Sequence, residues 1–224
     1  MKQATILKLA AIAGALALSA TQAVAATIDW TNWTSNTAGT ISGGVSVTHT
    51  GPSSLLLGFP SWTPTSTWAD GVLIGNAPPA SGNMLATTGG TNTVNSIVFS
   101  QPITNPVFAI WSLGQPGVTA TFDFINATPT FVAGGPNAEF GGVAFTVAGQ
   151  SAFGQEANGS LVFGGTFTSI SWTNPLFENY YGFTVGINGG TPGTPVIPVP
   201  AAAWLLGSGL MGLLAFSRRR KVAA

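Results

Sequence analysis

Alternation of apolar and polar residues is the clearest pattern in the middle of the chain. Residues 118–124 alternate strictly, which places Val118, Ala120, Phe122 and Phe124 on one face. A period of two residues is typical of half-buried strands. Other segments share this period or are rich in Thr, Val, Phe and Trp, as strands are: 28–33, 40–48, 96–99, 107–113, 143–147, 160–163, 167–173 and 181–185.

Gly, Pro, Asn and Ser separate these predicted strands at short intervals, and no long stretch combines a helical period with good helix formers. Many short strands with frequent turn signals predict an all-β domain, an antiparallel β-sandwich of jelly-roll-like type. Residues 53–90 are poorly patterned and contain four prolines outside any clear alternation. We expect long loops there, with one short strand at 72–74.

The first apolar run, at residues 9–18, does not alternate and is uncharged. Lys2 and Lys8 precede or border it, and Ala23-Val24-Ala25 follows. A positive start, a short apolar stretch and an A-x-A site are typical of a secretory signal peptide, so we predict residues 1–25 as the signal, cleaved after Ala25. Ten helical residues are too short to span about 30 Å of hydrocarbon.

The second apolar run, at residues 201–216, leads directly into the basic run 218–221. As a helix it covers about 24 Å, and flanking apolar residues with snorkelling Arg side chains extend it. We predict a single transmembrane helix with the basic run on the cytoplasmic side. The alternative is a buried core helix, which the adjoining basic cluster disfavours. The G-x-G-x-x-G match at 207–212 lacks the strand and following acid that a dinucleotide site needs.

The tail resembles the PEP-CTERM sorting signal over residues 197–221. The resemblance rests on the apolar helix together with Pro198, Val199, Pro200, Arg218, Arg219 and Arg220. The family has Glu between the prolines, where this chain has Val, and the tail looks like a hydrophobic variant of the signal. The resemblance implies recognition by an exosortase-type membrane transpeptidase in a Gram-negative bacterium that makes exopolysaccharide. It also implies removal of the tail and transfer of the protein to the cell surface or biofilm matrix.

The expected organisation is therefore a signal at 1–25, an exported β domain at 26–190, a Pro/Gly/Thr linker at 191–197 and a sorting signal at 198–221. A second, fainter resemblance links the β domain to the ectodomain of a group of PEP-CTERM proteins. Its residues are 105–114, 156–173, Glu178 and 181–186. That group implies no particular activity, so the resemblance adds no mechanism.

Charge is distributed very unevenly along the 224 residues. All six Lys and Arg lie at the two ends, so residues 27–197 hold all six acids and no base, a formal charge of −6 with the single His neutral. Nucleic-acid binding relies on Lys and Arg at phosphates, and phosphoryl transfer usually relies on the same residues, so both functions are disfavoured. The absence of Cys excludes disulfides, thiol chemistry and Cys-ligated zinc.

His49 is the only histidine and falls in phase with Ile41, Val45 and Val47. A Ser-His-Asp triad can be drawn around it, but no G-x-S-x-G elbow supports one. We expect a hydrogen-bonded strand-end histidine or an exposed one. With one His, a His-rich metal site is excluded.

The carboxylates are the remaining candidate groups for chemistry. Glu139, Glu156 and Glu178 can supply the pair of carboxyls that glycoside cleavage needs. Alternatively, Glu156, Asn158 and Glu178 offer oxygen ligands for Ca²⁺, although no D-x-D-x-D-G loop is present. Because the region has no basic residue, we expect solvent to satisfy most of these acids. We therefore predict no catalytic residue and no cofactor.

Trp62 and Trp68, with Asp70 nearby, fall in the loop-rich stretch. Flat aromatics beside hydroxyl and amide groups suit the faces of sugar rings, so these three residues are the candidate sugar-binding site. Packing in the interior is the alternative, and it is the expectation for Trp111 and Trp172.

The leading functional hypothesis is a non-enzymatic protein, anchored in the inner membrane with its β domain in the periplasm and then sorted to the cell surface or exopolysaccharide matrix. Its expected partners are the secretion machinery, the transpeptidase, the membrane and extracellular polysaccharide. The alternatives are a lectin-like carbohydrate-binding module and a secreted carboxylate-dependent glycoside hydrolase.

Overall fold

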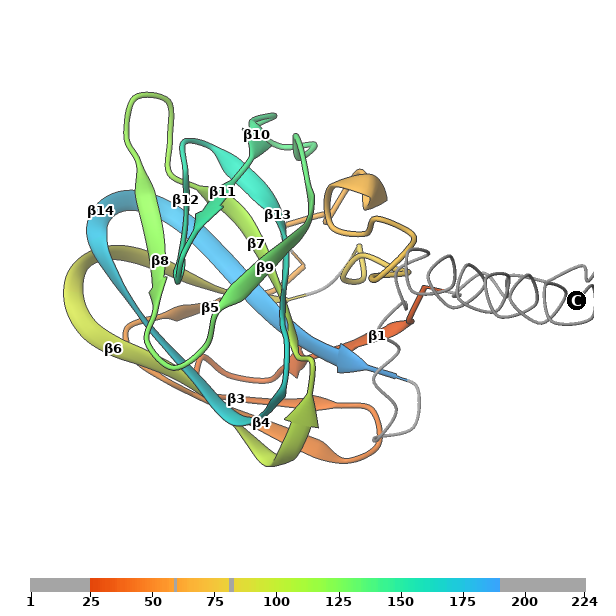
Figure 1. The fold of residues 1–224 in the computed structure, drawn as a ribbon. Coiled ribbons are helices and arrows are strands. Elements are labelled where there is room, and N and C mark those ends of the chain that lie inside the picture. Colours follow the sequence, from red (N-terminus) through yellow and green to blue (C-terminus); the bar gives the residue numbers. More distant parts are fainter. Residues whose placement is uncertain (1–24, 59, 81–82, 190–224) are drawn as a thin grey trace, which may run out of the picture.

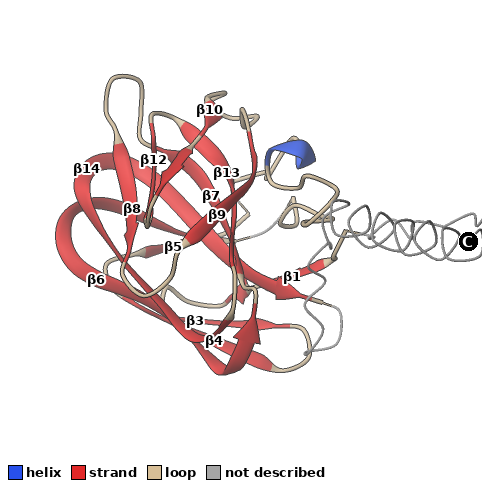
Figure 2. Ribbon diagram, in the orientation of Figure 1, coloured by secondary structure: helices blue, strands red, loops and turns tan. Residues whose placement is uncertain are grey.

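The computed structural model describes residues 25–58, 60–80 and 83–189. This part of the chain is all-β, as predicted, and its fourteen strands belong to one large sheet (Figure 2). Its helical content is a single 3-10 turn, η1 (Thr65–Thr67), so the described residues include no helix that is long and apolar enough to span a membrane. The predicted transmembrane helix, the linker and all of the predicted signal except Ala25 lie outside the described residues.

The strands follow in chain order: β1 (Ile28–Trp30), β2 (Asn32–Trp33), β3 (Ala38–Ile41), β4 (Val45–Thr50), β5 (Ser54–Leu56), β6 (Met84–Thr104), β7 (Val107–Leu113), β8 (Ala120–Phe124), β9 (Pro129–Gly134), β10 (Val143–Ala144), β11 (Thr146–Ala148), β12 (Ser151–Gly154), β13 (Ala157–Phe163) and β14 (Thr166–Asn188).

Strand β14 holds the sheet together. The main path of neighbours runs β10-β13-β7-β14-β6-β4-β3-β2, and β1 and β8 also pair with β14. Every strand pair is antiparallel except β10 with β13. In Figure 1, β14 runs through the middle of the body and β6 curves alongside it.

The two longest strands extend well beyond the segments that the sequence predicts, and β14 merges two of them. Residues 96–99 lie inside the 21-residue β6, and residues 167–173 and 181–185 both lie inside the 23-residue β14. Their pairing slips at four places, and these irregularities bend the strands without ending them. The Gly and Pro residues that indicate turns in the sequence are absorbed at the bends.

Shorter predicted segments are divided by turns. Residues 40–48 form part of the β3–β4 hairpin, whose turn contains Gly43 and Gly44 in the left-handed region at φ of 79° and 82°. Residues 28–33 divide into β1 and β2, and 143–147 into β10 and β11. The strand predicted at 72–74 is wrong, because only Ile74 makes an isolated bridge, to Ala26.

The interior is dominated by aromatic rings from several strands. The predicted alternation in β8 is confirmed, since Ala120, Phe122 and Phe124 are buried. Phe108 of β7 lies at the centre, with its ring 5.8 Å from Phe183 and 5.5 Å from Trp172, centroid to centroid. Burial of such rings supplies the main stabilising free energy of a domain that has no disulfide.

Candidate functional site

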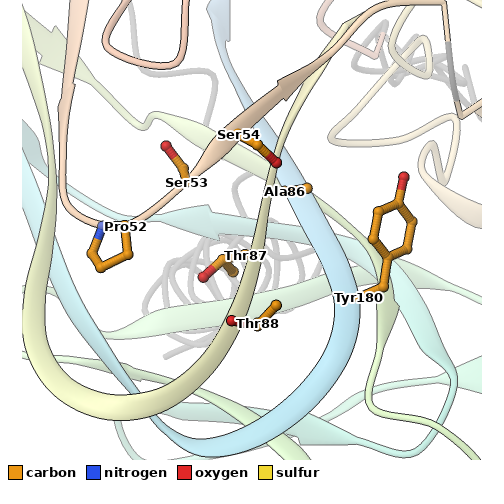
Figure 3. Close-up of a pocket in the computed structure, with 7 residues that line it drawn as sticks. All are labelled: Pro52, Ser53, Ser54, Ala86, Thr87, Thr88 and Tyr180. Atoms are coloured by element: carbon orange, nitrogen blue, oxygen red, sulfur yellow. The ribbon is translucent and has the colours of Figure 1, made fainter.

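An open pocket of about 180 Å³ lies where β5, β6 and β14 meet (Figure 3). Tyr180 forms one wall, opposite Pro52, and Ala86 lies between them. The other lining residues carry hydroxyl groups: Ser53, Ser54, Thr87 and Thr88. None of these seven side chains is charged, so the open pocket offers one aromatic surface and four groups that both donate and accept hydrogen bonds.

A break in strand register builds the Tyr180 wall. Phe177 pairs with Gly89 and Tyr181 pairs with Thr87, so three residues of β14 face the single residue Thr88 of β6. Extra residues of this kind make a strand bulge and re-aim its side chains. The bulge carries Tyr180 to the rim of the open pocket while Tyr181 stays buried.

Glycine is required opposite the bulge. Gly89 has a φ of 62°, and a Cβ atom there would lie 2.4 Å from the Leu176 carbonyl oxygen and 2.6 Å from the Tyr181 hydroxyl. No side chain fits that space without moving the backbone of β14. The close approach of β6 to β14 at this point depends on the missing side chain.

The Tyr180 ring is held from behind by Trp111. The two ring centroids are 5.8 Å apart at an interplanar angle of 87°, an edge-to-face contact. Trp111 is fully buried and also contacts Phe140 at 5.3 Å. The Tyr180 backbone N–H donates to Glu178 Oε1 at 2.8 Å. The core therefore fixes the aromatic wall, and burial raises the pKa of the Tyr180 hydroxyl.

A second group of polar residues begins at Ser112, which follows Trp111 in β7. Ser112 donates a hydrogen bond from its hydroxyl to Glu156 Oε1. Both residues have left-handed backbones, with φ of 56° and 52°. Neither is glycine, so each conformation costs on the order of 1–3 kcal/mol that the surrounding structure must supply. Burial raises the pKa of Glu156, and the Ser112 hydrogen bond opposes that change.

Glu178 is the most buried acid, with 3% of its surface exposed. Its Oε1 accepts the Tyr180 N–H, while its Oε2 is buried without a hydrogen-bond partner. Burial raises the pKa of Glu178, and the charge of Glu156 raises it further. The structure therefore brings Glu156 and Glu178 into electrostatic range of each other. Glu178 is enclosed, however, and Glu156 is hydrogen-bonded to Ser112.

Glu139 has the opposite electrostatic setting. Its Oε1 accepts the Ser61 backbone N–H at 2.9 Å. Partial burial alone would raise the pKa of the Glu139 carboxyl, but hydrogen bonds from Ser61 and Trp111 outweigh that effect and lower it. The expectation that solvent satisfies the acids is therefore wrong for Glu139, Glu156 and Glu178, which all accept hydrogen bonds from the protein.

Asn158 does not fit the predicted Ca²⁺ site. Its Oδ1 accepts the Ser112 N–H at 2.7 Å and the Asn137 amide at 2.8 Å, and its amide donates to the carbonyls of Gly135 and Gly141. Both lone pairs of Oδ1 are therefore occupied. Within the described ranges, no three acids or histidines are grouped as a metal site. The prediction that Glu156, Asn158 and Glu178 bind Ca²⁺ is not supported.

The structure does not present the predicted sugar site at Trp62, Trp68 and Asp70 as an exposed aromatic surface. Trp62 and Trp68 are 1% and 0% exposed and pack edge to face at 5.2 Å. The Trp68 indole N–H donates to the Ile110 carbonyl. Asp70 is exposed, but its Oδ1 accepts three backbone N–H groups of the turn that follows, those of residues 72, 73 and 74. The loop-rich segment folds inward because its tryptophans complete the core.

His49 is buried on the inward face of β4, as its phase predicts. Its Nδ1 is 3.1 Å from both the Asn36 carbonyl oxygen and Ser53 Oγ. A carbonyl oxygen only accepts, so the proton belongs on Nδ1, which then cannot accept the Ser53 proton. Burial lowers the pKa of His49, against its hydrogen bond to Asn36. His49 thus links β4 to the β2–β3 turn at Asn36.

The sequence gives no direct signal for Tyr180, Ser54, Thr87 and Thr88. They are distant in sequence and meet only through the β5–β6–β14 pairing. The sorting-motif residues Pro198, Val199, Pro200, Arg218, Arg219 and Arg220, and Ala23 of the cleavage site, lie outside the described residues. Comparison with protein families, curated proteins and solved structures finds no match to this chain.

Proposed function

We propose that the protein is exported, held transiently in the inner membrane and sorted to the cell surface or exopolysaccharide matrix, where it contacts polysaccharide without catalysis. The observation that carries the proposal is the separation of charge and apolar runs along the chain. Every basic residue lies in a terminal segment that also contains an apolar run, and every acid lies in the β domain between them. That pattern is typical of two processing signals flanking an exported domain.

The setting of the acids favours a non-enzymatic role. A general acid or base must reach its substrate within hydrogen-bond distance. Glu178 is enclosed, and Glu156 is held by Ser112, whereas the open pocket is lined by uncharged side chains. The open pocket is thus suited to contact and not to proton transfer.

We further propose that the sheet folds over on itself as an antiparallel sandwich with jelly-roll-like connections. The large core cluster supports this arrangement, because it joins Ile41 and Val47 of the β3–β4 hairpin to Phe108 of β7 and Phe122 of β8. An experimental structure in which these two groups of strands do not face each other would contradict it.

Cell fractionation tests the sorting step. The full chain, tagged within the β domain, is followed in cells with and without the exosortase-type transpeptidase. We expect a shorter form without the Arg cluster at the surface or in the matrix only when the enzyme is present. A tail that remains attached in both strains would contradict the proposal. Arg218, Arg219 and Arg220 replaced together by Ala serve as the matched substrate control.

A secreted carboxylate-dependent glycoside hydrolase is the second candidate. The specific observation in its favour is that Glu156 acts electrostatically on Glu178 and both carboxyls have raised pKa values, as a general acid requires. Turnover of a polysaccharide that is lost in both Glu156→Gln and Glu178→Gln would establish this function over the non-enzymatic one.

A further inference from the structure

The size and shape of the open pocket limit what it can hold. At about 180 Å³ it is smaller than the roughly 300 Å³ at which pockets that enclose a drug-sized ligand begin. It is also open to solvent, with Pro52 and Tyr180 on opposite sides (Figure 3). Such a site suits one ring-sized unit of a longer molecule that continues across the surface.

The chemistry of the lining matches a sugar ring. A pyranose has C–H groups on its faces and hydroxyls around its edge, and each hydroxyl both donates and accepts. Tyr180 supplies a partly exposed aromatic face, and aromatic rings pack well against such surfaces. Ser53 and Thr87 are already hydrogen-bonded within the protein, to Asn36 and Gly89 respectively. The hydroxyls of Ser54 and Thr88, both exposed residues, are left for a ligand.

The aromatic wall is organised in advance of binding. The buried Trp111 holds the Tyr180 ring edge to face, and the Tyr180 N–H is bonded to Glu178. A side chain that is already ordered loses little conformational entropy when a ligand arrives, so more of the contact energy appears as affinity. The left-handed Gly89 and the β14 bulge fix the backbone beneath the ring.

Charge selects among polysaccharides. Residues 27–197 contain no Lys or Arg to pair with the carboxylate, sulfate or phosphate groups of an acidic polymer, and their six acids repel it. A neutral polymer needs no basic partner and is not repelled by the acids.

We propose that the open pocket binds one pyranose unit of a neutral polysaccharide, with a ring face on Tyr180 and sugar hydroxyls bonded to Ser54 and Thr88. This inference rests on the proposed contact with polysaccharide and names its site and ligand class. It replaces the tryptophan loop as the lectin site.

Affinity electrophoresis and calorimetry with dextran, galactomannan and alginate test the inference. The full chain is used, purified in a detergent without a sugar headgroup. We expect the wild type to bind at least one of the two neutral polymers and not the anionic alginate. Tyr180→Ala should weaken that binding about tenfold or more, equivalent to about 1.4 kcal/mol, while Tyr180→Phe keeps the ring and most of the affinity.

Phe140→Ala is the matched control, because Phe140 is also exposed and also packs on Trp111 but does not line the open pocket. It should bind as the wild type does. If Tyr180→Ala does not fold, as judged by circular dichroism, the isosteric Thr88→Val provides the same test and should weaken binding severalfold.

The outcomes separate the two proposals. Binding to a neutral polymer that survives both Tyr180→Ala and Thr88→Val overturns the pocket assignment but leaves the polysaccharide contact intact. If the wild type binds neither dextran nor galactomannan, both the pocket assignment and the proposed contact with polysaccharide are overturned. That result does not bear on the sorting step. Alginate bound as tightly as the neutral polymers overturns the charge argument and with it the ligand class.

Discussion

At the scale of single residues, hydrogen bonds to uncharged groups take the place of salt bridges. Residues 27–197 contain no Lys or Arg, so each acid depends on backbone N–H groups, uncharged side chains or solvent. Glu139 and Glu178 illustrate the two results of that dependence. Donors from Ser61 and Trp111 lower the pKa of Glu139, whereas burial raises the pKa of Glu178.

These opposite shifts predict opposite pH dependences for two matched variants. In the unfolded chain both carboxyls ionise near 4.5. The folded protein keeps the Glu178 proton above that pH, so its contribution to the free energy of unfolding falls as pH rises from 4.5 through the raised pKa. We expect Glu178→Gln to stabilise the protein at pH 7 and to have little effect at pH 4, measured by urea unfolding.

Glu139→Gln is the control, with the sign reversed. The lowered pKa of Glu139 means that its carboxylate stabilises the folded state above pH 4.5, and that this stabilisation is lost as pH falls through the lowered value. The variant should therefore be less stable than the wild type at pH 7, with the difference shrinking at acid pH. If both variants changed the free energy of unfolding in the same direction at pH 7, the opposite pKa shifts of Glu139 and Glu178 would be contradicted.

At the scale of elements, the register of β14 against β6 determines where side chains lie. Alternation predicted the inward face of β8 and the phase of His49, because both depend only on neighbours along one strand. It did not predict the β14 bulge at residues 178–180, because a bulge is a property of two strands. Tyr180 and Thr88 could not be paired from the sequence for the same reason.

The bulge predicts an unequal effect of two glycine substitutions. Gly43 and Gly89 both have positive φ, but a Cβ at Gly43 meets nothing within 4 Å, whereas one at Gly89 meets the Leu176 carbonyl. Gly43→Ala should cost about 1–2 kcal/mol for the left-handed backbone alone. Gly89→Ala should cost clearly more, measured by urea unfolding at pH 7, and should also weaken binding at the open pocket. Equal losses would show that β14 does not approach β6 as closely as described.

At the scale of the whole molecule, the segment between β5 and β6 is part of the core. The sequence predicted long loops over residues 53–90. That prediction is wrong at residues 54–56 and 84–90, which lie in β5 and β6, and it is confirmed for most of the described residues between these strands. What composition could not indicate is that Trp62 and Trp68 turn inward. Local patterning reports which residues share a face, but it cannot report that an irregular segment folds back against β7.

Two substitutions in this segment distinguish a core component from a surface loop. Trp68→Ala should destabilise the protein by about 3–5 kcal/mol, because it leaves a cavity against Trp111 and removes the hydrogen bond to Ile110. Val72→Ala lies four residues further on, where 55% of the side chain is exposed, and should change stability by about 0.5 kcal/mol or less. Urea unfolding with an unchanged m-value is the measurement. A small loss of stability in Trp68→Ala would mean that the segment is not packed against β7.

The position of β14 in the chain has a consequence for biogenesis. It pairs with β1, β6, β7 and β8, yet it is the last strand of the described residues, ending at Asn188. Until the ribosome has made it, β1 has no strand partner and β6 and β7 are not joined to each other. The strands made before β14 therefore cannot complete the sheet by themselves, and the sheet closes only after β14 has emerged.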